Sequence, residues 1–258
     1  YMVLSTKAGS YGKSSSLQHT GAIDTTTLQV APDGSFEILL SAARKPGNWL
    51  PMSAESSMLL VRQTFLDRGT ERPAALEIEC LNGPARPAPL DPERLSVQLL
   101  AAADFVQGTA RIFADWSQRF KANPNAFTVL DQAEFLRQGG DPAIFYAHGY
   151  WALGPEQALL IDVPPSENEF WNLQIDNYWM ESLDYRYFTI HLNKRTTRYR
   201  PDGSAVLVLA HRDPGVPNWL DTAGHDLGTM LYRVVRGADP AYPRTRVVAL
   251  AEVREALG

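Results

Sequence analysis

The chain contains a diverged internal repeat, and this repeat restricts the folds open to it more than any other feature. The tetrapeptide Pro-Asp-Gly-Ser occurs at 32–35 and again at 201–204, each time followed by an apolar run. Three further matches follow in the same order, with nearly constant spacing: Asn48-Trp49-Leu50 and Asn218-Trp219-Leu220, Arg62 and Arg233, and Pro73 and Pro243. Anchors repeated in one order predict two copies of one structural unit.

Each copy has the pattern of an antiparallel β unit. An Asp-Gly pair between alternating segments is a strong signal for a tight turn, and it predicts a hairpin in each copy. Aliphatic strands are expected at 58–65 and 229–235. The only cysteine, Cys80, shares one face of an alternating segment with Leu76 and Ile78, which predicts a buried core residue, with a reactive thiol as the alternative.

Between the copies the pattern becomes helical. Asp91 is suited to cap a helix that begins at Pro92, and apolar residues then recur at helical spacing as far as Phe120. A second short helix is expected at 131–138. The chain is therefore predicted to be mainly β, with two related antiparallel sandwich or jelly-roll-like units at 1–90 and 141–258 and a helical insert at 91–140. Residues 1–5 read as the middle of a strand, which predicts that residues are missing upstream.

Charge and hydropathy exclude several classes of partner. The formal net charge of −5 and the pI near 5.6 argue against nucleic-acid binding, which depends on clustered Lys and Arg. No apolar run approaches the length of a membrane span. A soluble protein, with the cytoplasm as the favoured compartment, is the resulting expectation, and assembly into a homo-oligomer is left open.

The segment 170–179, with the sequence FWNLQIDNYW, has the strongest pattern of a binding surface. Alternation places Trp171 with apolar residues on one face and sets amide, carboxyl and aromatic groups on the other. Such a mixture suits a small-molecule or glycan-like ligand, because rings supply apolar contact and amides fix orientation; an ordinary exposed sheet face is the alternative. The predicted ligand-binding residues are Trp171, Asn172, Gln174, Asp176, Tyr178 and Arg233. A purely structural role, binding backbone carbonyls or a carboxylate, is the alternative for Arg233.

The second copy also carries ionisable residues that the first lacks. His211, Asp221 and His225 stand opposite Ala42, Pro51 and Glu55 when the anchors are superposed. A histidine paired with a carboxylate can act as a general base or join a metal site, so these three are the candidate catalytic residues. Neither a cofactor motif nor a reaction-defining motif is recognisable, so no cofactor is predicted and a divalent metal stays an open alternative.

Several motifs of the second half resemble one family. With Glu169-Phe170-Trp171, Asp202-Gly203-Ser204, Asp213-Pro214-Gly215 and Asn218-Trp219-Leu220-Asp221, residues 145–252 are similar to the family called domain of unknown function 1214. The first repeat resembles a shorter form of the pattern, without the Phe-Trp strand expected upstream. The resemblance implies a jelly-roll type of sandwich and implies no activity. Acid/base catalysis of hydrolase or lyase type is one hypothesis for function, and a non-catalytic carbohydrate-binding or assembly module is the other.

Overall fold

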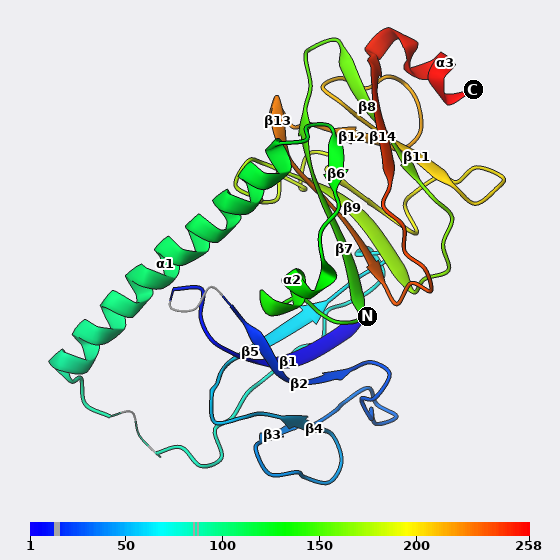
Figure 1. Ribbon diagram of the computed structural model, residues 1–258. Helices are drawn as coiled ribbons and strands as arrows, with labels where there is room; N and C mark the ends of the chain where they lie inside the picture. Colours follow the sequence, from blue (N-terminus) through cyan, green and yellow to red (C-terminus); the bar gives the residue numbers. More distant parts are fainter. Residues whose placement is uncertain (13–15, 85, 87) are drawn as a thin grey trace. The chain divides into compact units, whose positions relative to one another are not determined.

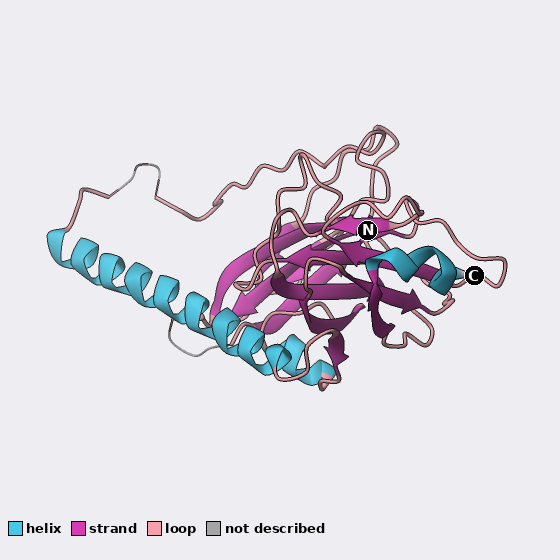
Figure 2. Cartoon of the chain, turned by 90° about the horizontal axis from the view of Figure 1, so that it is seen from above, coloured by secondary structure: helices cyan, strands magenta, loops and turns pink. Residues whose placement is uncertain are grey.

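The computed structural model describes residues 1–12, 16–84, 86 and 88–258. The chain divides into two compact units, Tyr1–Thr109 and Ala110–Gly258, which we call the first and second units. Strands predominate over helices (Figures 1 and 2). In chain order the elements are β1 (Met2–Ala8), β2 (Gln18–Asp24), β3 (Leu39–Ser41), β4 (Trp49–Pro51), β5 (Ser56–Gln63), α1 (Pro92–Lys121), β6 (Ala126–Thr128), α2 (Gln132–Arg137), β7 (Ile144–Ala152), β8 (Gln157–Val163), β9 (Phe170–Asp176), β10 (His191–Asn193), β11 (Ala205–Ala210), β12 (Trp219–Asp221), β13 (Leu227–Val235), β14 (Arg244–Ala249), a 3-10 turn at Leu250–Glu252 and α3 (Val253–Leu257).

The second unit is a sandwich of two sheets. One sheet has five strands in the order β10-β9-β13-β7-β6, and the other has four in the order β12-β11-β8-β14. The strands β7, β8 and β11 are almost entirely buried, in keeping with their continuous apolar runs. Side chains from both sheets, such as Leu173, Met230, Ile161 and Leu207, form one core between them. The second unit therefore has a complete hydrophobic interior of its own.

The first unit is smaller and less well covered. Its three-stranded antiparallel sheet has the order β2-β1-β5, and β3 pairs in parallel with β4. Leu4, Ile23 and Leu50 form its buried core, and Leu40 packs against them only partly buried. All three residues of β3 are half-buried, whereas all six of β11 are buried.

Hydrogen bonds confirm the internal repeat at the Asp-Gly turns. Asp33 Oδ1 accepts from the backbone N–H and the hydroxyl of Ser35 at 2.9 and 2.7 Å. Asp202 Oδ1 accepts the same two bonds from Ser204, at the same two distances. Both turns thus have the local geometry that the short Asp side chain favours.

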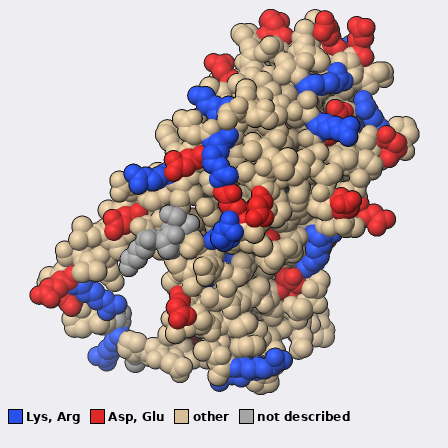
Figure 3. Space-filling model, in the orientation of Figure 1, with Lys and Arg blue, Asp and Glu red and all other residues tan. Residues whose placement is uncertain are grey.

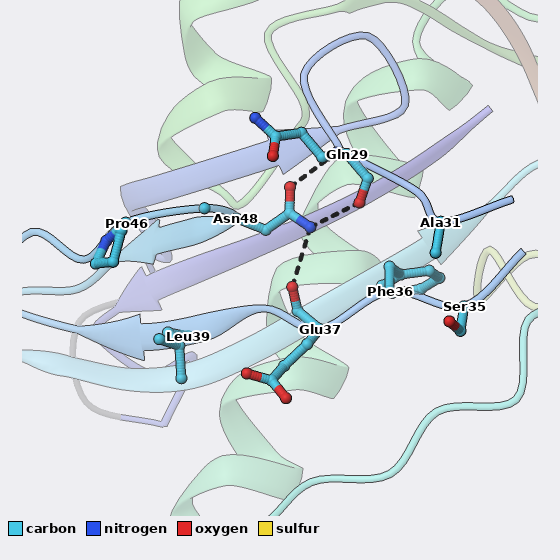
Figure 4. A pocket seen from close by; sticks show the side chains of 9 residues that line it. Gln29, Ala31, Ser35, Phe36, Glu37, Leu39, Pro46 and Asn48 are labelled. Atoms are coloured by element: carbon cyan, nitrogen blue, oxygen red, sulfur yellow. Dashed lines mark hydrogen bonds between the residues drawn. The ribbon is translucent and has the colours of Figure 1, made fainter.

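The Asn-Trp-Leu anchor keeps its bonds as well. Asn218 Nδ2 donates to the carbonyls of Arg198 and Val206 at 2.8 and 3.0 Å, and its Oδ1 accepts from Arg198 N at 2.8 Å. Asn48 makes the same three bonds to the corresponding two residues of the first unit, at 2.8, 3.0 and 2.7 Å (Figure 4). The anchor asparagine therefore ties two backbone segments to the parallel strand pair in each copy.

Strand register shows which strands correspond. Arg62 of β5 pairs with Val3 of β1, and Arg233 of β13 pairs with Asn172 of β9. The first strand of the chain, β1, thus holds the place of β9. The first repeat lacks the aromatic Phe-Trp pair, as predicted, while β1, with the sequence MVLSTKA, supplies the strand itself.

The Asp-Gly turns agree with the local prediction, and the segment around Cys80 does not. The Asp-Gly turns close locally, with Ala31 N donating to the Ser35 carbonyl at 2.9 Å and Arg200 N to the Ser204 carbonyl at 2.8 Å. The strands that follow the turns pair elsewhere in the described part of the chain, β3 with β4 and β11 with β12 and β8. Cys80 is exposed rather than buried, and residues 71–80 form no strand. Alternation predicts a strand only where a partner strand is available, and within the described residues none pairs with this segment.

The helical insert is confirmed. Asp91 Oδ1 accepts from the backbone N–H groups of Glu93 and Arg94, which caps α1 as predicted. Asp131 caps α2 in the same way through Ala133 N. In the described part of the chain, no helix has both the length and the apolarity needed to cross a bilayer. Basic and acidic side chains are interspersed on the face that Figure 3 shows.

Candidate functional site

The strand β9 presents two dissimilar faces, as its alternation predicts. Trp171, Leu173 and Ile175 point into the core of the second unit. Asn172, Gln174 and Asp176 therefore lie on the opposite face of the five-stranded sheet. This opposite face carries the groups with chemical potential.

The neighbouring strands add further polar groups to that face. In β13, Arg233 stands opposite Asn172 and Thr229 opposite Asp176. The next strand, β7, places Tyr146 beside Arg233, and His148 and Tyr150 follow at alternate positions. We call the resulting surface the polar face. Its members are Tyr146, His148, Tyr150, Asn172, Gln174, Asp176, Thr229 and Arg233.

Asp176 is the most perturbed acid of the polar face. Its exposed fraction is 2 %, and Gln174 Nε2 donates a hydrogen bond of 2.6 Å to its carboxylate. Burial raises the pKa of Asp176 to about 6, against the opposing effects of this hydrogen bond and the Arg233 charge. A carboxyl group with such a pKa can both take up and release a proton near neutral pH.

His148 is perturbed in the opposite sense. Burial, together with the smaller effect of the positive charge of Arg233, lowers the pKa of His148 to about 3, so the imidazole is neutral. The ring stacks on Phe120 of α1 and on Phe135 of α2, with centroid separations of 5.2 and 5.1 Å. The helices α1 and α2 therefore cover this part of the polar face.

Buried polar atoms without partners occur on the same strands. Within the described residues, His148 Nδ1, the Tyr150 hydroxyl and Thr128 Oγ1 have no hydrogen-bond partner. Thr128 of β6 stands directly opposite His148 in the sheet. Such atoms are costly to bury, and in native proteins they call for a specific explanation such as a bound water or ligand.

Gly228 allows the strands β13 and β9 to approach each other closely beside Asp176. A β-carbon at Gly228 would lie 2.1 Å from the Asp176 carbonyl oxygen and 3.0 Å from Trp151 Nε1. Only glycine lets β13 approach β9 this closely beside Asp176. Beyond the strand end, the ring of Tyr178 meets the ring of Tyr150 edge to face at 6.5 Å. Tyr178 thus lies next to the polar face.

Trp171, the remaining predicted ligand-binding residue, lies elsewhere. It is 3 % exposed and belongs to the core, and its Nε1 donates to the Tyr199 hydroxyl at 3.1 Å. An aromatic platform of Trp171 at the surface is therefore not part of the site. Asn172, Gln174, Asp176 and Arg233 do share one face.

The three candidate catalytic residues surround a turn on the other sheet. His211 Nε2 contacts the Leu153 carbonyl at 3.1 Å, and its Nδ1 contacts Thr222 Oγ1 at 2.9 Å. A carbonyl only accepts, so Nε2 carries the proton and, in the neutral ring, Nδ1 accepts from the threonine hydroxyl. Both ring nitrogens of His211 are thus engaged in holding backbone and turn together.

Asp221 and His225 contribute to the same turn separately. Asp221 Oδ1 accepts from Ala223 N at 2.8 Å, while His225 is exposed and donates its backbone N–H to the Thr222 carbonyl at 3.0 Å. In the described part of the chain, no hydrogen bond or ion pair joins any two of the side chains of His211, Asp221 and His225. Nor do the described residues contain a group of three or more His, Cys, Asp or Glu side chains that could hold a metal ion.

Sequence reasoning missed His148 and Tyr150. The available signal was the alternation of Tyr146, His148 and Tyr150 in the strand at 144–152, which sets three polar rings on one face. The perturbation of His148 depends on its cover by α1 and α2, and this cover is a tertiary feature.

Fold and site define the chain as a mainly β protein built from a duplicated sheet framework, with an ionisable polar face in its second unit. The family model described as a protein of unknown function (DUF1214) matches residues 8–65 and 158–238, together more than half of the chain. The chain belongs to the DUF1214 family.

Two solved structures are similar to the chain. The chain is 49% identical to an uncharacterized protein from Burkholderia cenocepacia; the match covers 97% of this chain and 70% of that one, with a TM-score of 0.94. A protein from Vibrio parahaemolyticus matches at 12% identity and a TM-score of 0.47, over 96% of this chain and 82% of that one. No curated protein matches the chain.

Proposed function

We propose that the second unit binds a small hydroxylated, glycan-like molecule on its polar face, and that Asp176 acts there as an acid/base. Asn172, Gln174, Asp176, Tyr178 and Arg233 would contact the ligand. The proposal rests on one observation, the buried carboxyl group of Asp176. Its pKa is raised to about 6 although the cation of Arg233 acts to lower it. Perturbed groups of this kind concentrate at functional sites.

The chemistry of the face suits such a ligand. Side-chain amides can both donate to and accept from hydroxyl groups, and the guanidinium of Arg233 can fix an oxygen-rich group through two parallel bonds. The protonated carboxyl of Asp176 can donate to a leaving oxygen, and its ionised form can accept a proton from a hydroxyl or an acidic C–H. These steps belong to hydrolysis, elimination or isomerisation.

His211, Asp221 and His225 are a second set for proton transfer, and they stay a prediction. The polar face has stronger support than this set, because Asp176 is buried and perturbed, whereas His211 uses both ring nitrogens in fixed contacts. Those fixed contacts also support the alternative in which the unit is a non-catalytic carbohydrate-binding or assembly module.

The test is a ligand-observed NMR screen of the purified full chain against hexoses, uronic acids and oligosaccharides. Asp176→Asn should weaken binding of any hit by at least tenfold, as expected when a charged partner is lost. Asp162→Asn is the matched control, because Asp162 is a half-buried carboxylate on β8 of the other sheet. A hit that Asp176→Asn binds as tightly as the wild type would contradict the proposal.

The acid/base role has its own readout. Affinity for the hit should change across a transition near pH 6 in the wild type and in Asp162→Asn, and this transition should be missing in Asp176→Asn. If His211→Ala removes the transition and Asp176→Asn keeps it, the second set carries the chemistry instead. Binding that is independent of pH in all variants would support the non-catalytic module.

A further inference from the structure

The three central strands of the five-stranded sheet bring one row of side chains together on the polar face. The strand β13 lies between β9 and β7 (Figure 1). Thr229 of β13 stands opposite Asp176 of β9 on one side and opposite Tyr150 of β7 on the other. Residues that stand directly opposite each other share a face of the sheet. Asp176 and Tyr150 therefore flank Thr229, with their Cα atoms about 10 Å apart, which is twice the strand spacing.

Tyr150 has a buried hydroxyl group that the fold does not use. The residue is 1 % exposed, and within the described residues its hydroxyl has no hydrogen-bond partner. The hydroxyl of Thr229, its neighbour in the row, donates instead to the Asn177 carbonyl at 3.3 Å. A buried polar group without a partner needs an explanation in a native protein, and a ligand that accepts from it is one.

The ring of Tyr150 lies beside the end of β9 that carries Asp176. It meets the ring of Tyr178 edge to face at 6.5 Å, and Tyr178 follows Asp176 by two positions. Burial, together with the smaller effect of Tyr178, raises the pKa of Tyr150, so the phenol is protonated at neutral pH and can donate a hydrogen bond. The Asp176 carboxyl also has capacity left, because Gln174 is its one hydrogen-bond donor in the described part of the chain.

The two groups differ in what they offer to a ligand. The phenol of Tyr150 is a donor, while the ionised carboxylate of Asp176 only accepts. A hydroxyl group suits both, because its oxygen accepts from the phenol while its hydrogen is donated to the carboxylate. A carbonyl oxygen in the same place would leave the carboxylate unpaired, and a C–H group would leave both groups unpaired.

We propose that Tyr150 is a further ligand-binding residue of the polar face, which holds one ligand hydroxyl group together with Asp176, above Thr229. The assignment rests on the proposed function and sharpens it, because it names the chemical group that the site selects. Tyr150 would then determine specificity for a hydroxyl group at one position of the ligand.

The surface beside this row is apolar, which favours a sugar ring as the carrier of the hydroxyl group. Leu231 follows Thr229 on the same face of β13, is 5 % exposed and stands between Gln174 and His148. A sugar ring has hydroxyl groups at its rim and C–H groups on its face. It can therefore rest on the leucine while one hydroxyl group reaches the Asp176 row.

The test compares sugars with their monodeoxy analogues in NMR titrations of the purified full chain at neutral pH. The probes are D-glucose, D-galactose and D-glucuronate, each with analogues that lack one hydroxyl group. For the sugar that binds most tightly, one analogue should bind the wild type at least tenfold more weakly, because a site built for a hydroxyl group rejects a ligand without it. Tyr150→Phe should weaken the parent sugar at least tenfold, and the further penalty for that analogue should be smaller, because both changes remove the same interaction.

Tyr242→Phe is the matched control, and stability supplies a second readout with the opposite sign. The Tyr242 hydroxyl accepts from Leu130 N at 3.2 Å and donates to the Leu130 carbonyl at 3.3 Å. Its removal should lower the urea midpoint and leave sugar binding unchanged. Tyr150→Phe should weaken binding and keep or raise the midpoint, because it removes a buried hydroxyl group that has no partner.

Three results would overturn the assignment. If Tyr150→Phe binds the parent sugar as tightly as the wild type while Asp176→Asn binds it weakly, the assignment fails and the proposed function stands. If Tyr150→Phe lowers the urea midpoint as far as Tyr242→Phe does, the Tyr150 hydroxyl has a structural partner instead. If none of the three sugars binds the wild type, the assignment is wrong, and the wider ligand screen decides the proposed function.

Discussion

The two parallel strand pairs, β3–β4 and β11–β12, are built on the same anchors and differ in what surrounds them. Each has an Asp-Gly-Ser turn and an asparagine that bonds two backbone segments, with hydrogen-bond lengths that agree closely. Yet β11 is buried along its whole length and β3 is half-buried. The comparison teaches that local sequence sets the geometry of a strand pair, while strands distant in sequence decide how deeply it is buried.

The same contrast extends to ionisable groups. By register, Lys7 of β1 occupies the position that Asp176 occupies in β9, and both are buried. Lys7 contacts His19 Nε2 in the first unit, and Asp176 accepts from Gln174 in the second. The same strand position therefore carries a basic residue in the first unit and an acidic residue in the second. At this position the two copies differ in chemistry while the strand pairing is the same.

The largest expected effect comes from a leucine that both copies share. Leu209 is fully buried in the core of the second unit, and Leu40, its counterpart, is half-buried. Leu209→Ala should lower the free energy of unfolding by about 2 to 5 kcal/mol, as typical for a core truncation. Leu40→Ala should cost only about 1 kcal/mol, since less surface and a smaller cavity are involved. Urea denaturation of both variants measures the difference. Equal losses would show that the two strand pairs are covered to the same degree.

A somewhat smaller effect is expected from pH, because two perturbed groups on the polar face oppose one another. The pKa of Asp176 rises from 3.8 to about 6 in the folded chain, so its contribution to stability is greatest in acid and falls as the pH rises through 6. The pKa of His148 falls from 6.5 to about 3, so its contribution is greatest above 6.5 and falls as the pH drops towards 3. Between pH 4 and 6 the two slopes are equal and opposite, at about 1.4 kcal/mol per pH unit each.

Single variants should expose each slope. Relative to the wild type, Asp176→Asn should lose about 3 kcal/mol of its unfolding free energy between pH 6 and pH 4, because the His148 slope is then unopposed. His148→Gln should show the reverse trend over the same interval. Urea denaturation at pH 4, 5 and 6 provides the values, and Asp162→Asn serves as the control. If Asp176→Asn and His148→Gln follow the wild-type profile, neither group is perturbed by the polar face.

The parts of the fold that could be predicted from sequence are those determined by neighbouring residues. The Asp-Gly turns, the cap of α1 at Asp91 and the two faces of β9 all depend on side chains within a few positions of one another. The prediction of a strand around Cys80 was wrong because a strand also needs a partner strand. The residues near Cys80 in the sequence do not supply one. The Asp-Gly turns close as their residues predict, but which strands β3 and β11 pair with could not be predicted from these residues.

In the candidate site, too, only the features determined by neighbouring residues could be predicted from the sequence. Asn172, Gln174 and Asp176 could be placed together from alternation alone, and the same alternation assigned Trp171 to the apolar side, where the structure has it. The pKa of Asp176 and the burial of His148 could not be predicted. The pKa of Asp176 is raised by its burial in the folded unit, against the opposing charge of Arg233 from another strand. His148 is covered by aromatic rings of α1 and α2.

The smallest expected effect comes from the anchor tryptophans, Trp49 and Trp219. Their local hydrogen bonds are alike, so replacing them tests whether the two copies gain the same stability from the same bond. Trp219 Nε1 donates to the Ala210 carbonyl, and Trp49 Nε1 donates to the Ser41 carbonyl, both at 3.1 Å. Replacing either with phenylalanine removes this donor and retains most of the ring, so each should cost about 1 kcal/mol of unfolding free energy. The losses should add in the double variant, because the two tryptophans share no partner. If urea denaturation shows a loss of stability for Trp219→Phe alone, the anchor tryptophan stabilises only the buried strand pair β11–β12. Burial by neighbouring strands, rather than the local hydrogen bond, would then determine how much the tryptophan contributes to stability.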